Sequence, residues 1–461
     1  MSVFTKFGRV KQVHILSQRG QNFLKAPWAG GIVLVFCVIV AMLLANLPAT
    51  ADMYHHLLHM EFGLSVDGHC FPESMTLEKF VNDGLMVIFF FTVGLEIRRE
   101  ISDGQLSTPK KAVLPIIGAV GGMLFPAIIY ICFNGGTEVS NGWGIPTATD
   151  IAFAIGIMSL LGNRVPISLK VFLTALAVAD DLGAILVIAL FYGEAPNLML
   201  IGIAVVIMIG IYFMRRMGEF RIVAYLIPAV IVWTLFYYSG VHATLSGVIM
   251  AMLIPTKPRY SRSYYLRKAD IIEKGIIDAD KIEDKHEAAE SRMYYLRRMK
   301  QISNGAEGMS HRMEHLLMPY VNFLIMPIFA LMNAGVHIPS AEYFNIFEYD
   351  AMAGSIGMGI FFGLVIGKPL GITLLSYIAI KLGIAERPDG ATWKMFLAVA
   401  CLGGIGFTMS IFVDNLAFDK ATHEEFINMG KIAILMSSVV AALLGSLMIV
   451  REAKHKKHLK Q

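Results

Sequence analysis

Two adjacent carboxylates, Asp180 and Asp181, lie inside a long apolar run of the chain. The run extends from Val171 to Leu190 and contains Thr174 as its only other polar side chain. About 20 apolar residues in a helix cross a bilayer. A carboxylate there costs about 2.5–3.5 kcal/mol on insertion scales, so two together are expected to face water, a cation or a base. The pair predicts an ion or proton pathway, with a satisfied structural pair as the alternative.

The two carboxylates cannot share one direction, since neighbours on an α-helix are about 100° apart. One is expected to face an aqueous cavity while the other turns toward a neighbouring helix. Carboxylate, hydroxyl and water oxygens form the hard shell that an alkali cation needs. Two carboxylates this close in an apolar medium should hold protons when no cation is bound and release them when one arrives. Such competition for one site is sufficient for cation/proton exchange.

Two other apolar segments contain helix-breaking residues. Gly144–Gly156 includes Pro146, two threonines and Asp150, and proline both lacks an NH and disfavours helix in the residue before it. Cys401–Ser410 contains three glycines, which permit an unwound stretch. Interrupted spans at corresponding positions in two halves indicate a transporter with inverted repeats and a binding site near the membrane midplane.

Crossed broken helices bring like ends together, leaving NH groups on one side and carbonyl groups on the other. A carboxylate stabilises the first arrangement and an ammonium the second, each by about 0.3–1 kcal/mol or more. Asp150 lies in one broken segment, and Lys368 lies in the apolar run Phe361–Gly371. We expect these two side chains to compensate the helix ends, and Lys368 also to pair with Asp180. The alternative for Lys368 is an ammonium that reaches the membrane interface.

Composition and hydropathy predict an all-α polytopic membrane protein. Hydrophobic residues make up 56% of the chain and charged residues 16%, against about 45–50% and 25% in soluble domains. The four cysteines have no metal-binding spacing, and the basic N-terminal stretch precedes an apolar segment too long for a cleaved signal peptide. About twelve spans are expected, with the broken segments as the fourth and eleventh. They centre on 29–47, 80–98, 112–133, 142–161, 167–192, 199–214, 221–237, 241–255, 314–335, 352–379, 394–413 and 427–450.

Charge alternates between successive loops, which fixes the predicted orientation. Lys and Arg gather on one set of loops, whereas the other set is acidic, and cytoplasmic loops carry the excess of Lys and Arg. Twelve spans with both termini in the cytoplasm reproduce this alternation. The basic residues are Arg98, Arg99, Lys110, Lys111, Arg164, Lys170, Arg215, Arg216 and Arg221, with five more in the C-terminal tail.

One long charged segment divides the membrane part in two. The expected organisation is an N-terminal membrane part (1–255), a cytoplasmic insertion (256–312), a C-terminal membrane part (313–450) and a basic tail (451–461). The insertion has mixed charge, and stretches such as Asp280–Lys300 have helical composition. We expect exposed helices held by charge pairs three or four residues apart. A solvated linker is the plainer interpretation, and a regulatory or partner-binding role is the alternative.

Six stretches of the chain together resemble one family, the NhaA-type sodium/proton antiporters. The resemblance covers residues from about 20 to 255 and from 312 to 450. The stretches are Phe91–Glu100, Ile145–Ala154, Ala179–Ala184, Ser239–Leu245, Gly367–Gly371 and Gly404–Ser410. The insertion between the eighth and ninth spans is longer than the usual connection in this family.

This resemblance implies a pH-regulated, electrogenic exchanger in the bacterial inner membrane. It would export Na⁺ or Li⁺ and import more than one proton per cation, with no cofactor and no nucleic-acid partner. By similarity, Asp180 and Asp181 carry the cation and protons, Asp150 with Thr149 lies at the helix crossing, and Lys368 is the compensating base. A homodimer is also implied, although the outer loop Ala49–Glu78 departs from the family pattern. Candidates for pH sensing are Glu96, Arg99, Glu100 and Glu314 on the cytoplasmic side, together with His242.

Other classes of membrane protein, and purely structural roles for the same residues, are the alternatives to this prediction. An intramembrane aspartyl protease needs two carboxylates on different helices, which an adjacent pair cannot supply. A sodium-coupled symporter should show a pocket of aromatic and polar residues beside the ion site, and none is evident, whereas an uncoupled channel stays open as an alternative. His242 could serve only as an interhelical hydrogen-bond partner. The Glu96–Glu100 charges could serve only to fix orientation at the membrane edge.

Overall fold

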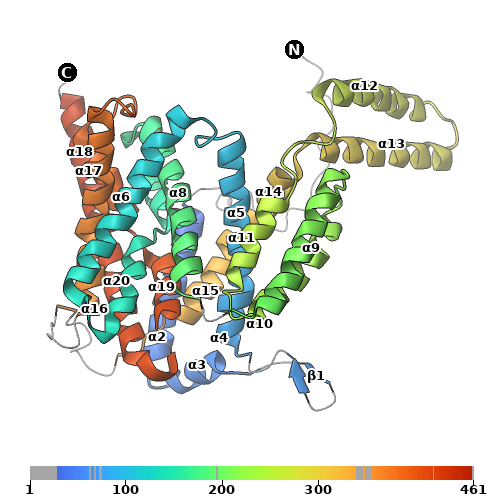
Figure 1. Cartoon of the computed structure of the whole chain (residues 1–461). Coiled ribbons are helices and arrows are strands. Elements are labelled where there is room, and N and C mark those ends of the chain that lie inside the picture. The colour runs from blue at the N-terminus through green and yellow to red at the C-terminus, as the bar shows by residue number, and fades with distance from the viewer. Residues whose placement is uncertain are drawn as a thin grey trace.

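The computed structural model describes residues 28–61, 64–66, 69–71, 75–193, 196–338, 346–347, 355–418 and 420–458. The described chain is predominantly helical (Figure 1), which agrees with the prediction of a polytopic helical protein. The basic N-terminal stretch and several residues of the acidic loops, including Glu194 and Asp350, lie outside the described residues.

The first half of the chain contains ten α-helices and a short β-hairpin among the described residues. Two 3₁₀ segments (η2 and η3) and one π-helical turn (η1) adjoin them. In chain order the elements are α2 (Ala29–Asn46), α3 (Ala51–Leu58), β1 (Leu64–Val66), β2 (His69–Phe71), α4 (Leu77–Phe80), η1 (Val81–Leu85), α5 (Met86–Ser102), α6 (Pro109–Asn134), η2 (Glu138–Thr147), α7 (Ile151–Leu161), η3 (Gly162–Arg164), α8 (Ile167–Phe191), α9 (Leu198–Arg216), α10 (Ile222–Tyr238) and α11 (Thr244–Leu253).

The second half begins with two helices in the charged segment and returns to apolar helices after them. Two further π-helical turns, η4 and η6, lie within spans of this half. The elements are α12 (Arg262–Ala279), α13 (Lys285–Ala306), α14 (Met309–Tyr320), η4 (Val321–Ile325), α15 (Met326–Asn333), α16 (Ile356–Phe362), η6 (Gly363–Gly367), α17 (Lys368–Lys381), α18 (Trp393–Gly403), α19 (Phe407–Ala417) and α20 (Lys420–His458).

Nine helical segments in the described part of the chain are long and apolar enough to cross a membrane. The bent pair α18 and α19, which meet at 46°, makes a tenth if it is counted as one span. The apolar helices α10 and α11 are shorter. These segments coincide with the twelve regions expected from hydropathy, but length and composition alone qualify only nine or ten.

The outer loop contains structure that the sequence analysis did not predict. After α3, strands β1 and β2 form an antiparallel pair in which Leu64 is opposite Phe71 and Val66 is opposite His69. The all-α fold class holds for the described chain, and this hairpin of two three-residue strands is a local exception in the outer loop. The alternation of a strand over three residues is too short to be recognised from sequence.

Two of the three π-helical turns lie just before a proline. The turn η6 ends two residues before Pro369, and η4 ends two residues before Pro327. A proline inside a helix has no NH to donate, and its ring clashes with the carbonyl group four residues earlier. A wider turn relieves this conflict, and such turns are frequent at functional sites. Here η6 directly precedes Lys368 and sets where its side chain leaves the helix.

Close packing of α6 against α17 holds Lys368 inside the bundle. Gly121 and Gly371 face each other, and a Cβ atom on either one would overlap the carbonyl oxygen of the other. Small residues at such crossings let helix backbones approach closely in membranes. Gly122 is also tightly packed, since a Cβ atom there would lie 3.0 Å from Cγ1 of Ile372 and 3.7 Å from Cε of Lys368.

Two spans are interrupted near the centre of the bundle. The 3₁₀ segment η2 ends at Thr147, and α7 begins at Ile151 after three residues without helical structure. Likewise α18 ends at Gly403 and α19 begins at Phe407. The first half of the fourth segment is a 3₁₀ helix and not an α-helix, since Pro146, two glycines, Ser140 and Asn141 weaken α-helical bonding there.

The charged segment forms a helical hairpin at one end of the bundle. Helices α12 and α13 extend to the side, while α3 and the β-hairpin lie at the opposite end (Figure 1). Exposed ion pairs join Lys274 to Asp270 and Lys281 to Asp278, each at 2.8 Å, with spacings of four and three residues. A further pair joins Arg292 of α13 to Asp280. The prediction of exposed helices is confirmed, but the ion pairs three or four residues apart lie in and just after α12, and the pair within Asp280–Lys300 is spaced twelve residues apart.

Candidate ion-binding site

Asp180 is the centre of a buried polar cluster. It lies in α8 with 2% of its surface exposed, and its Oδ2 accepts hydrogen bonds from the Thr149 hydroxyl at 2.6 Å and the Lys368 ammonium at 2.8 Å. The ammonium also donates to the carbonyl oxygen of Thr147 at 2.5 Å. Oδ1 of Asp180 is buried and has no hydrogen-bond partner among the described residues. One oxygen of this carboxylate is therefore held in place, and the other is free to bind an ion.

Lys368 lies fully inside the protein, not at a membrane interface. Its exposed fraction is 0%, although it follows a π-helical turn in a span that continues to Lys381. An ammonium without water must be paired and hydrogen-bonded to be tolerated. Asp180 and the end of η2 supply those partners. The expectation that Lys368 compensates a helix carbonyl end and pairs with Asp180 agrees with these contacts.

Asp181 is as deeply buried as Asp180 but has different surroundings. Its exposed fraction is 2%, and it makes no hydrogen bond or ion pair with the described part of the chain. The charged groups that act on it are Asp180, Glu96, Asp150 and Lys368. A buried carboxylate without partners is costly when charged. Asp181 is thus arranged to gain from a bound proton or cation.

Asp150 joins the two interrupted spans through its carboxylate. Oδ1 accepts a bond from the Phe153 NH at 3.0 Å, within the first turn of α7. Oδ2 accepts bonds from the Thr408 NH at 3.2 Å and the Thr408 hydroxyl at 2.5 Å, within the first turn of α19. One carboxylate therefore caps two helix N-termini, which would otherwise carry partial positive charge and orphan NH groups.

The carbonyl ends of the same spans meet on the other side of the crossing. The Thr149 hydroxyl lies 2.9 Å from the carbonyl oxygen of Gly403, where α18 ends, and the Asp150 NH donates to Ile405 at 2.7 Å. Ser410 in α19 donates to the carbonyl oxygen of Ile145 in η2 at 2.9 Å. Because Thr149 has one hydroxyl hydrogen, it bonds either Gly403 or Asp180 at a given moment.

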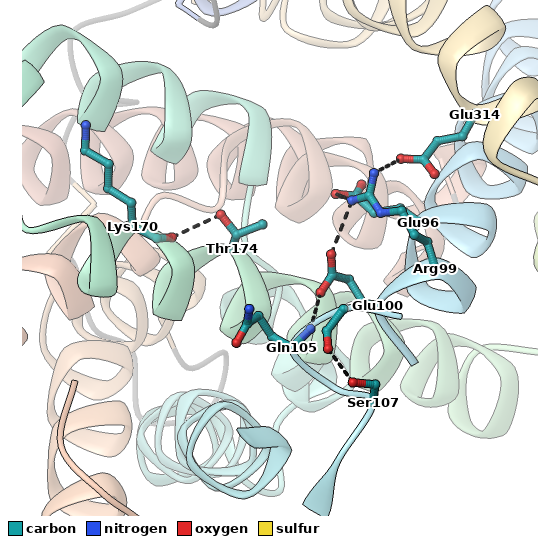
Figure 2. A network of polar contacts seen from close by, with 9 residues as sticks. Glu96, Arg99, Glu100, Gln105, Ser107, Lys170, Thr174 and Glu314 are labelled. Carbon is teal, nitrogen blue, oxygen red and sulfur yellow. Dashed lines mark hydrogen bonds and ion pairs between the residues drawn. The ribbon is translucent and has the colours of Figure 1, made fainter. Parts of the chain in front are cut away.

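A second charge cluster lies between α5 and α14 (Figure 2). The Arg99 guanidinium contacts Glu314 at 2.5 Å, Glu100 at 3.3 Å and Glu96 at 3.7 Å. Glu314 is 1% exposed, and its Oε2 is buried without a hydrogen-bond partner among the described residues. Glu100 also accepts a bond from the backbone NH of Gln105 at 2.8 Å, which ties the cluster to the loop after α5. The structure thus brings together four of the five residues expected in pH sensing.

His242 lies apart from this cluster. It follows α10 at the end of the bundle where α8 ends, and its Nε2 is 2.5 Å from the carbonyl oxygen of Tyr192. Because a carbonyl oxygen only accepts, this nitrogen carries the hydrogen of the bond. The sequence analysis named His242 as a candidate separate from the cytoplasmic cluster. The cluster lies in the last turns of α5, and His242 lies between α10 and α11, at the other end of the bundle (Figure 1).

Several polar partners were not identified from the sequence. Thr147 contributes only a carbonyl oxygen, which carries no side-chain signal. Thr408 was quoted only as part of a glycine-rich stretch, although a hydroxyl residue beside a helix break is a ready partner for a carboxylate. Asp414 and Lys431 are also buried inside membrane helices, and the rule that singled out Asp180 applies equally to them.

A buried carboxylate–ammonium pair where two interrupted membrane helices meet defines a class, the secondary transporters. The family model for Na⁺/H⁺ antiporter 1 matches residues 21–449. Curated relatives named Na⁺/H⁺ antiporter NhaA include one from Wolinella succinogenes, 41% identical over 95% of this chain and 94% of the relative. Others are from Sulfurimonas denitrificans, 43% identical over 92% and 93%, and Salmonella arizonae, 38% identical over 92% and 96%. The chain belongs to the Na⁺/H⁺ antiporter 1 family.

Proposed function

We propose that this protein exchanges Na⁺ for H⁺ across a bacterial membrane and that Asp180 and Asp181 bind both ions. The observation that carries this proposal is the asymmetry of two adjacent buried carboxylates. Asp180 is held by Thr149 and Lys368, whereas Asp181 has no hydrogen-bond partner among the described residues. The curated relatives are named for the same exchange. The protein acts as a transporter and not as an enzyme, and Li⁺ is a second cation of suitable charge.

The contacts suggest how one site exchanges the two ions. Without Na⁺, a proton neutralises Asp181 while Asp180 stays paired with Lys368. Na⁺ entering between the carboxylates replaces the proton on Asp181 and takes the free Oδ1 of Asp180 and the Thr149 oxygen as ligands. Its charge weakens the bond from Lys368 to Asp180, so the ammonium loses a second proton. Release of two protons for one monovalent cation makes the cycle electrogenic.

Twelve crossings with both termini in the cytoplasm fit this function and the distribution of charge. The nine long apolar segments, the bent pair α18 and α19, and the shorter α10 and α11 add up to twelve. Basic residues end α9 and begin α6, and cytoplasmic ends carry such residues. In this orientation the α12–α13 hairpin is cytoplasmic, and α3 and the β-hairpin face outward. The membrane itself is assigned as the bacterial inner membrane. The interrupted fourth and eleventh spans would be related by an inverted repeat.

Regulation by pH is assigned to the cluster of Glu96, Arg99, Glu100 and Glu314. Three carboxylates share one guanidinium there, so protonation of any carboxylate changes how Arg99 is held. Glu96 also acts electrostatically on Asp181, which links the cluster to the ion site. His242 is a weaker candidate, because its bond to Tyr192 serves equally well as a structural contact.

The remaining parts of the chain are assigned to support roles. Residues 1–255 and 313–450 form the transport unit, 256–312 are a cytoplasmic insertion, and 451–461 are a basic cytoplasmic tail. A homodimer would use the outward loop, because a two-stranded sheet leaves backbone groups unpaired along both edges. Crosslinking of single cysteines placed in this loop would test that contact.

Proteoliposomes with an imposed pH gradient test the proposed exchange. Addition of Na⁺ should dissipate the gradient with the parent protein and leave it unchanged with Asp181→Asn. Asp270→Asn on the exposed α12 is the matched control and should behave as the parent. Na⁺ flux without proton movement would indicate a channel, and parent-like exchange by Asp181→Asn would exclude the shared site.

A further inference from the structure

A second ionisable pair is buried in the bundle outside the site described above. Asp414 of α19 is 0% exposed, and Lys431 of α20 is 5% exposed. The two groups interact electrostatically. Neither group is among the contacts of Asp180, Thr149 or Lys368. Ionisable residues inside a membrane cost free energy, so such a pair indicates a function.

The Asp414 carboxylate lacks the hydrogen bonds that a permanent charge would need. Both of its oxygens are buried and have no hydrogen-bond partner among the described residues. They lie against Gly430, where any Cβ atom would overlap them. Asp414 also acts electrostatically on Tyr130 and Tyr192, whose hydroxyl groups donate elsewhere, to the carbonyl oxygens of Val139 and Asn141. The neutral, protonated form of the Asp414 carboxyl therefore costs less free energy than the charged form.

Asp414 lies between the helix crossing and the outer face. It is six residues beyond Thr408, the partner of Asp150, and thus about 9 Å farther along α19. Tyr130 lies in the last turns of α6 and Tyr192 directly follows α8, and these helices end on the α3 side of the bundle (Figure 1). This side is outward in the orientation proposed above.

We propose that Asp414 relays protons between the outer face and the Asp180–Asp181 site, with Lys431 compensating the carboxylate whenever its proton has left. A proton needs one oxygen, whereas Na⁺ needs several, and the Asp414 oxygens have no hydrogen-bond partner in the part of the chain that the structure describes. The positive charge of Lys431 also disfavours a second cation. In each transfer Asp414 accepts one proton from outside and passes one proton inward, so it returns to its starting state.

This inference rests on the proposed exchange, and its test separates the two. Purified Asp414→Asn should bind ²²Na⁺ as the parent does, because the central carboxylates are intact. In proteoliposomes its exchange rate should fall about a hundredfold, as expected when a positioned proton carrier is lost, and its solvent deuterium isotope effect should rise. Ser437→Ala, a buried change in α20 whose hydroxyl bonds only its own helix, is the control. A parent without exchange contradicts the proposed function, whereas a normal rate in Asp414→Asn contradicts only the relay.

A double variant distinguishes proton relay by Asp414 from a purely structural role. Loss of one member of a buried charge pair destabilises a protein, whereas loss of both is often tolerated. Asp414→Asn/Lys431→Met should therefore be as thermally stable as the parent and still exchange slowly. Recovery of the parent rate in the double variant would show that Asp414 only balances Lys431.

Discussion

The buried Asp180–Lys368 pair and the surface Asp270–Lys274 pair have the same nitrogen–oxygen distance but differ in exposure to water. In both, the ammonium nitrogen is 2.8 Å from a carboxylate oxygen. The side chains of the first pair are 3% and 1% exposed, and those of the second are 62% and 70% exposed. Water and salt screen the surface pair, so it adds little to stability. The buried ions have lost their hydration, so each depends on the other and on any ion that enters.

The comparison indicates that the medium, and not the contact distance, decides how strongly each charge of a pair depends on its partner. An ion that enters the buried site changes the balance of all charges there, because no solvent replaces a lost partner. On the exposed α12–α13 hairpin, water solvates a charge that has lost its partner. The predictions below use this contrast, beginning with the largest effect.

Removal of one buried charge should have the largest effect. Lys368→Ala leaves Asp180 unpaired, which should lower the free energy of unfolding by about 3–5 kcal/mol. Thermal melting in detergent measures this loss, and Asp180→Asn/Lys368→Met should recover most of it. Lys274→Ala on α12 should leave the melting temperature unchanged. Equal shifts for Lys368→Ala and Lys274→Ala would contradict the contrast between the two regions.

Loss of the shared helix cap should have the next largest effect. Asp150→Ala leaves the first turns of both α7 and α19 without their acceptor, and each lost cap costs about 1 kcal/mol, or about 2 kcal/mol together. Thr408→Val removes only the hydroxyl bond and should cost less. Thermal melting distinguishes them, and equal stability of Asp150→Ala and the parent would mean that the carboxylate does not cap these helices.

Neutralisation of Glu314 should change regulation and spare the maximal rate. Gln imitates the protonated carboxyl, the state expected at acidic pH, so Glu314→Gln should keep the exchanger inactive up to a higher pH. The pH at half-maximal exchange in proteoliposomes should therefore move in the alkaline direction. The surface variant Glu273→Gln should leave the profile in place, and an unmoved profile in Glu314→Gln would remove this residue from the pH response.

Deletion of the hairpin should have the smallest effect on transport. The backbone NH of Tyr260 bonds Gly305 at 3.0 Å, and that of Ser310 bonds Pro255 at 3.1 Å, so the two ends of the hairpin are adjacent. A short Gly/Ser linker in place of residues 260–308 can therefore close the gap. Maximal exchange should stay within a few-fold of the parent, because loop closure costs change by only about 0.6 kcal/mol per doubling of length. Loss of exchange at every pH in a folded deletion would place the hairpin in the transport unit.

Much of the candidate site was predictable because membrane interiors make polar residues conspicuous. Asp180, Asp181, Asp150 and Lys368 stand out from apolar runs, and proline and glycine mark both interruptions. The shared cap at Asp150 depends on where two distant helix ends meet, which no spacing in one segment reveals. Asp414 was missed because the predicted eleventh span ended at residue 413, one residue short of it.

Proton release on Na⁺ addition tests the central claim most directly. The claim is that the site holds either Na⁺ between Asp180 and Asp181 or protons on Asp181 and Lys368, and not both. Purified protein in weakly buffered detergent solution should release protons when Na⁺ is added, and Asp181→Asn should release none, with choline chloride as the ionic-strength control. Proton release by Asp181→Asn equal to that of the parent, or no release by a parent that exchanges in proteoliposomes, would contradict competition at this site.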